Sequence, residues 1–201
     1  IFIDRLSAGE RPAVGLAAAE AVAAARDALA ARRRFALLSV VAARGPAPKA
    51  LVAPHAGYVY SGAIAASAYG RLRDARGIER VVLMGPAHRV FVRGLATSTA
   101  EAFTTPLGDI EIDRATTARL EEISYVAPND RAHAPEHSLE VHLPFLQVVL
   151  GDFTLVPVVV GEASVGEVEA ALDVVWGGPE TLIVISTDLS HHYDYETARR
   201  L

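Results

Sequence analysis

The sequence predicts a single α/β domain with a mainly parallel central sheet flanked by helices. Short apolar runs rich in β-branched residues alternate along the chain with helix-like stretches, the pattern of strand–helix–strand units. Several of these runs end in glycine, proline or histidine, as strands do when they lead into ligand-binding loops. The 201 residues, 51% of them hydrophobic, suffice for one core but are few for two. We therefore expect one domain over residues 1–201.

The first half of the chain is expected to supply a helix, three strands and a second helix. Residues 13–34 are dominated by alanine, with arginines gathering toward the end, which favours a helix. Residues 35–41 and 50–53 are apolar runs on either side of a Gly- and Pro-containing break, so they read as two buried strands. The small-residue run 63–72 suits a helix packed closely on a sheet, and 80–84 is a continuous apolar strand.

The second half begins with an insert and returns to alternating helices and strands. Residues 103–112 contain Thr-Thr-Pro-Leu-Gly-Asp, a turn between short extended pieces, so a hairpin is expected. Asp113 is suited to capping a helix that reaches residue 123. The remaining expected elements are a helix, a strand, a helix and a strand, at residues 138–150, 153–160, 166–176 and 181–186.

Composition excludes several classes of function. The net charge of -5 comes from scattered acids and leaves no broad basic face, so nucleic acid is not an expected partner. The chain has no cysteine, so a metal would have to use His, Asp or Glu. The longest near-apolar stretch, residues 13–29, is Ala-rich and carries charges, so we expect no membrane span. No secretion signal opens the chain, and a cytoplasmic location is expected.

Two histidines follow predicted strands directly. His55 comes after the strand 50–53 and is followed by two glycines, which allow backbone to approach a ligand closely. His88 ends the sequence Gly-Pro-Ala-His after the strand 80–84. Each alone is equally well explained as a hydrogen-bonded residue in a turn. Together they indicate a shared pocket, because the carboxyl ends of parallel strands meet at one edge of a sheet.

A third segment places a carboxylate and two imidazoles after the strand 181–186. Asp188, His191 and His192 lie within five consecutive residues there. An aspartate can orient an imidazole that acts as a base or a ligand. This spacing favours a functional role over a structural one.

The fourth segment, residues 136–142, has two readings. His137 can share a helix face with Glu140 but not at the same time with His142, because neighbours on a helix are three or four residues apart. Helix capping by Ser138, with Glu140 paired to a histidine inside the core, is the alternative to a site. We expect His137 in or just behind the pocket, because it does not follow a strand.

The four segments together resemble the Memo family, whose bacterial members are often called AmmeMemoRadiSam system protein B. The matching motifs are found in order at 54–58, 85–88, 136–145 and 186–191, and the resemblance covers about residues 45 to 195. It implies a fold similar to that of class III extradiol ring-cleaving dioxygenases, which use non-haem Fe(II) to insert both oxygen atoms of O2 into catechols. Dioxygenase activity is not expected of every Memo protein.

The resemblance also implies roles for individual residues. His55 and His88 match the metal-liganding histidines, and His191 matches the histidine that serves the dioxygenases as acid and base, with Asp188 beside it. The family places a cysteine near its C-terminus as the third group at the metal, and this chain has none. We therefore expect the C-terminal part of the family domain to be missing from this chain.

Two functional hypotheses follow. The first is a dioxygenase-like oxidoreductase dependent on Fe(II), with Zn or Cu as other metals that imidazoles suit. The second is a module that binds a peptide or small molecule in the same cleft without chemistry, with Tyr58 and Tyr60 at the rim. The residues expected behind the metal ligands or in contact with a substrate are His137, Glu140, His142, His192 and Tyr58.

Overall fold

The computed structural model describes residues 48–188 and Thr197. The helix expected at 13–34 and the strand expected at 35–41 lie outside the described residues, as do His191 and His192.

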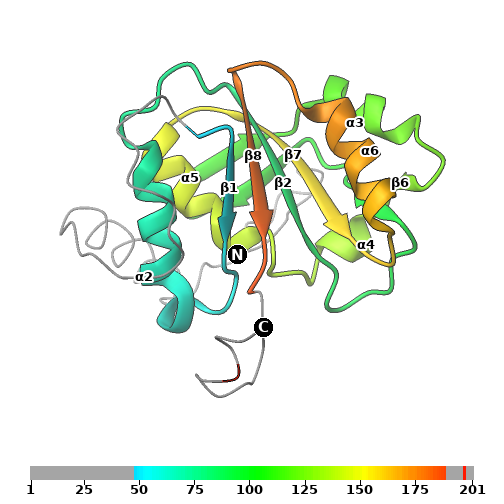
Figure 1. Ribbon diagram of the computed structural model, residues 1–201, viewed down its shortest axis with the longest axis horizontal. Helices are drawn as coiled ribbons and strands as arrows, with labels where there is room; N and C mark the ends of the chain where they lie inside the picture. Colours follow the sequence, from blue (N-terminus) through cyan, green and yellow to red (C-terminus); the bar gives the residue numbers. More distant parts are fainter. Residues whose placement is uncertain (1–47, 189–196, 198–201) are drawn as a thin grey trace, which may run out of the picture.

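A six-stranded sheet forms the centre of the fold, with strand order β1-β8-β2-β7-β3-β6 (Figure 1). The four strands β1, β8, β2 and β7 run parallel to one another. β3 runs antiparallel to β7 and parallel to β6. The prediction of a mainly parallel sheet is therefore confirmed. The strands of this sheet are β1 Ala50–Ala53, β2 Arg80–Pro86, β3 Leu95–Thr97, β6 Val126–Pro128, β7 Thr154–Val160 and β8 Thr181–Ser186.

Helices connect the strands, and a separate hairpin is inserted after β3. The hairpin consists of β4 (Ala102–Thr105) and β5 (Gly108–Glu111), as expected. The helices and 3-10 turns are α2 Tyr58–Tyr69, η1 Gly70–Leu72, α3 Arg114–Glu121, α4 Asp130–His133, η2 Glu140–His142, α5 Leu143–Leu150 and α6 Val165–Val175.

The sheet buries both faces, as the strand sequences require. Alternate residues of a strand point to opposite faces, and in β2 Val81 and Leu83 join one core while Val82 and Met84 join the other. The first core includes side chains of α2 and α5, and the second includes side chains of α3 and α6. Figure 1 shows these two helix pairs on either side of the sheet. Helices therefore flank the sheet, as predicted.

Some elements differ from the expectation in their bounds, and others were not expected. α2 begins at Tyr58 directly after Gly57, so the loop that carries His55 is shorter than the sequence suggested. The helix expected from residue 138 begins as the 3-10 turn η2 and becomes α-helical only in α5. The short elements β3, β6 and α4 were not expected.

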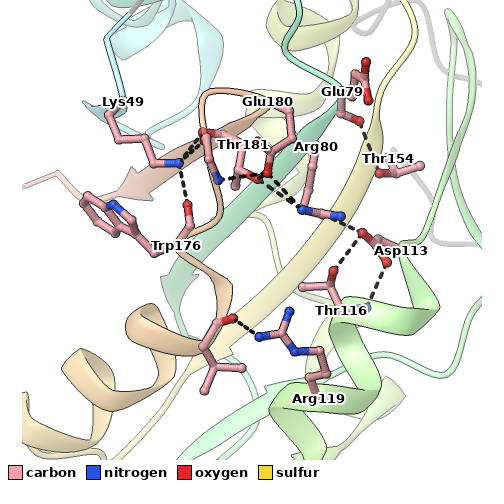
Figure 2. Close-up of polar contacts among 12 residues, drawn as sticks. Lys49, Glu79, Arg80, Asp113, Thr116, Arg119, Thr154, Trp176, Glu180 and Thr181 are labelled. Atoms are coloured by element: carbon pink, nitrogen blue, oxygen red, sulfur yellow. Dashed lines mark hydrogen bonds and ion pairs between the residues drawn. The ribbon is translucent and has the colours of Figure 1, made fainter.

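Polar side chains form hydrogen bonds and ion pairs at the amino ends of the central strands (Figure 2). The ammonium group of Lys49 donates to the backbone carbonyls of Trp176, Gly178 and Thr181. Arg80, at the start of β2, donates from Nε to Asp113 at 2.6 Å.

None of the helices among the described residues has both the length and the apolar character needed to cross a bilayer.

Candidate metal site

His55 and His88 meet at the carboxyl edge of the sheet. Each lies two residues beyond a strand, β1 and β2 respectively, and β8 pairs in parallel with both strands. Parallel strands aim their carboxyl ends at the same edge. Their imidazole rings lie 5.1 Å apart between centroids, in an edge-to-face arrangement.

His137 joins the pair from the segment between α4 and η2. Its ring centroid lies 4.8 Å from that of His88 and 5.7 Å from that of His55. One potential ligand atom from each of the three histidines lies within 4.8 Å of the others. The sequence expectation put His137 in or just behind the pocket, and the structure brings it beside the other two histidines. The three residues thus form a group that can hold a metal ion.

Glu136 fixes the tautomer and position of His88. Its Oε1 lies 2.8 Å from Nδ1 of His88, and its Oε2 accepts the backbone N–H of the same residue at 2.6 Å. A carboxylate can only accept, so Nδ1 of His88 carries the proton. Nε2 of His88 then presents the lone pair that a metal needs. An acidic partner behind a ligating imidazole is a common feature of metal sites.

The Glu136 carboxylate is ionised although its side chain is only 2% exposed. Burial acts to raise its pKa, but the hydrogen bonds from the backbone and side chain of His88 and from the backbone of Ser138 outweigh it and lower the pKa to about 2. Oε1 also accepts the backbone N–H of His137 at 2.9 Å. One buried charge therefore organises two of the three histidines.

Two serines fix the tautomer of His55. Oγ of Ser186 donates to the backbone carbonyl of Ser138 at 2.6 Å and lies 2.7 Å from Nδ1 of His55. Because the single hydroxyl proton goes to the carbonyl, Nδ1 of His55 must be the donor in the second contact. Nε2 of His55 then carries the lone pair, as in His88.

Asp188 holds the loop that carries His55. Its Oδ1 accepts the backbone N–H groups of His55 at 2.7 Å and Ala56 at 3.0 Å, and its Oδ2 lies 3.6 Å from Nε2 of His55. The sequence expectation paired Asp188 with His191, which lies outside the described residues. In the described part of the chain its contacts are with the His55 loop.

Gly85 allows the His137 segment to approach β2. A Cβ atom at this position would lie 2.9 Å from both Oγ of Ser138 and Cδ1 of Leu139. Oγ of Ser138 donates to the carbonyl of Pro86 at 2.8 Å, which anchors the segment to the end of the strand. The Gly-Pro-Ala-His motif thus supplies His88 itself, and its glycine leaves room for the segment that carries His137.

The other residues singled out from the sequence differ in depth: His142 is buried, Glu140 and Tyr58 are half-buried, and Tyr60 is 82% exposed. His142 is fully buried, with Nδ1 2.9 Å from the hydroxyl of Tyr69, and burial, with a smaller effect of His55, lowers its pKa to about 3. Burial, with the Glu136 carboxylate adding to it, raises the pKa of Glu140 to about 7. The ring of Tyr58 packs on Phe145, at 5.9 Å between centroids.

The site is reached from solvent on one side. His55 is 1% exposed, whereas the side chains of His88 and His137 are 31% and 38% exposed. Burial lowers the pKa of His137, which keeps its imidazole neutral at pH 7. The group is therefore anchored on the sheet side and open on the other, the arrangement of a site that admits a ligand.

Sequence reasoning missed the residues that orient the histidines. Glu136 and Ser186 stand inside the recognised motifs but were given no role. The signal for Glu136 was present, because an acid next to a histidine in a buried segment needs a partner. No pattern in the sequence connects Ser186 with Ser138, because their contact spans 48 positions.

Comparison with known proteins matches residues 25–200 to the family described as Memo-like protein. A MEMO1 family protein of Aquifex aeolicus is 39% identical over 160 residues, covering 76% of this chain and 58% of the relative. One of Methanopyrus kandleri is 40% identical over 163 residues, covering 75% and 56%. One of Archaeoglobus fulgidus is 38% identical over 157 residues, covering 76% and 58%. The chain thus spans a little over half the length of the curated relatives it matches.

Proposed function

Because this chain belongs to the Memo family, we propose that His55, His88 and His137 bind Fe(II) and that the loaded site carries out a dioxygenase-like oxidation. The observation that carries the proposal is the convergence of three imidazoles within 4.8 Å at the open carboxyl edge of the sheet. Gathering neutral imidazoles there has no packing benefit, since small apolar residues would fill the same space at lower cost.

The donor set fits a divalent transition metal. Imidazole nitrogen suits Fe, Zn and Cu, and three protein ligands leave further coordination positions open for water or substrate. The contacts at Nδ1 of His55 and His88 support binding through Nε2 in both residues. Among these metals we propose Fe(II), from the family resemblance, and Zn and Cu are the alternatives that the first experiment separates.

The chain's own residues orient the ligands and handle protons. Bound Fe(II) would supply Lewis acidity and the redox chemistry of oxygen. Glu136 and Ser186 hold the imidazoles in place, and Asp188 holds the backbone of the His55 loop. We propose His191, three residues after Asp188, as the group that removes a proton from a bound diol.

Metal analysis of anaerobically purified protein tests the site. We expect one equivalent of iron in the parent, and loss of iron in His55→Ala, His88→Ala and His137→Ala. His191→Ala should keep iron and lose oxygen uptake with catechol. Loss of iron in that variant as well would make His191 a ligand and overturn its role as a base.

A non-catalytic binding module is the other outcome. It would follow if the parent takes up no oxygen with any diol tested, while calorimetry still detects binding of a small molecule or peptide that the histidine variants lose. Retention of metal in all three ligand variants would refute the metal site itself.

A further inference from the structure

We propose that Arg89 anchors a carboxylate of the substrate, so that the three-histidine site selects an anionic ligand. This inference rests on the proposed metal site and adds the class of substrate. The substrate would carry an oxygen group that reaches the metal and a carboxylate a few atoms away that reaches the guanidinium.

The position of Arg89 is the first argument. It directly follows His88, one of the proposed metal ligands, in the loop after β2, and it is exposed to solvent. Within the described part of the chain, Arg89 forms neither a hydrogen bond nor an ion pair. Its positive charge acts on the ring of His137, whose pKa is lowered by burial first and by the His88 and Arg89 charges after it.

The neighbouring acids do not neutralise this guanidinium, because they are engaged elsewhere. Glu136 accepts hydrogen bonds from the backbone and ring of His88 and from the backbones of His137 and Ser138. Asp188 accepts from the backbone of the His55 loop. A guanidinium with five donors and no acceptor among the described residues is suited to a planar, bidentate carboxylate.

The balance of charges around the loaded site also favours an anionic ligand. A divalent ion and Arg89 carry three positive charges, against the two negative charges of Glu136 and Asp188. Glu140 adds only part of a charge at neutral pH, because burial raises its pKa to about 7. The loaded site therefore has a positive balance on its open side and attracts an anion.

A pair of matched chelators tests the inference without requiring turnover. The monohydroxamate of succinic acid carries a metal-binding group and a carboxylate, and the corresponding monohydroxamate of succinamide replaces that carboxylate by a neutral amide. Calorimetry with the Zn(II)-loaded full chain gives the Kd of each probe. We expect the parent to bind the carboxylate probe about three- to tenfold more tightly, the range for a partly exposed charge pair.

Three variants test whether Arg89 causes the preference for the carboxylate probe. In Arg89→Gln the two probes should bind equally, whereas the affinity for the amide probe should not change. Arg89→Lys should retain part of the preference, because lysine keeps the positive charge but lacks the planar guanidinium group that can bind both carboxylate oxygens. Arg93→Gln is the matched control, since Arg93 is exposed in the same loop but acts on Glu167 of α6, and it should keep the full preference.

The outcomes distinguish this inference from the proposed function. If both probes bind the parent and Arg89→Gln leaves their ratio unchanged, Arg89 is not the anchor, while the metal site stands. If neither probe binds the Zn(II)-loaded parent, the metal site fails and the anchor fails with it. A preference that Arg93→Gln also abolishes would mean that general surface charge, rather than Arg89, selects the anion.

Discussion

Replacing Glu136 by glutamine removes the buried negative charge next to the site but keeps the shape of the side chain. The substitution therefore tests whether the charge is needed to position His88. Oε1 of Glu136 lies 2.8 Å from Nδ1 of His88, 2.9 Å from the backbone nitrogen of His137 and 3.0 Å from that of Ser138. Oε2 accepts only the backbone N–H of His88, at 2.6 Å. A glutamine keeps most contacts by placing its carbonyl oxygen where Oε1 was. Its NH2 group then faces the backbone N–H of His88. Both groups are donors, so the hydrogen bond between them is lost.

The size of the effect follows from these contacts. One buried N–H left without an acceptor costs about 1 to 3 kcal/mol of the free energy of unfolding. The three remaining hydrogen bonds also weaken, because a neutral oxygen accepts less strongly than a carboxylate. The ring of His88 is then held less firmly, and loss of such a partner typically lowers metal affinity by about 10 to 100 fold.

Two measurements check this prediction. Urea unfolding of the metal-free protein gives the change in stability, and competition with a chelator gives the change in metal affinity. Glu121→Gln is the control, because Glu121 accepts one hydroxyl hydrogen bond from Thr97 on the other side of the sheet and should leave metal affinity unchanged. If Glu136→Gln binds metal as tightly as the parent, the argument that this carboxylate positions His88 is wrong.

Four further predictions concern the same framework. Ser186→Ala removes the acceptor for Nδ1 of His55 and should lower metal affinity by about 10 to 100 fold in the same competition assay. Gly85→Ala puts a methyl group 2.9 Å from Oγ of Ser138, so it should displace the His137 segment, and weaker metal binding with β2 still folded by circular dichroism would show this. Because the pKa of Glu136 is lowered to about 2 from an ordinary 4.5, its contribution to stability is complete above pH 4.5 and is lost as the pH falls toward 2. The parent should therefore lose more stability than Glu136→Gln over that interval in urea unfolding. Asp113→Ala removes the cap of α3 and the partner of Arg80 at the opposite edge, so thermal unfolding should show a loss of about 0.5 to 2 kcal/mol, with metal affinity unchanged.

The parallel part of the sheet was predictable because its strands are long and apolar on both faces. β8 has the bounds expected from the sequence, Thr181–Ser186, and β2 and β7 differ from the expectation by no more than two residues. β3 and β6 have only three residues each and give no periodic signal. Their pairing depends on tertiary contacts rather than on local pattern.

The histidine positions were predictable only where a strand delivers them. His55 and His88 follow strands, so the topology places both at one edge. The expectation for His137 rested only on its not following a strand, and the segment stays irregular until η2 begins at Glu140. Its path depends on the carboxylate of Glu136 and on the space above Gly85, neither of which a spacing rule describes.

The position of β8 has a consequence for synthesis of the chain. β8 is the last strand of the described fold to leave the ribosome, yet it lies between β1 and β2 and pairs with both. Until it is made, β1 has no partner among the described strands, and the segments bearing His55 and His88 stand on either side of a gap. Ser186 and Asp188 arrive with this strand and complete the hydrogen bonds around His55. Before this strand is inserted, the segments that carry His55 and His88 therefore cannot take up the arrangement that they have in the folded chain.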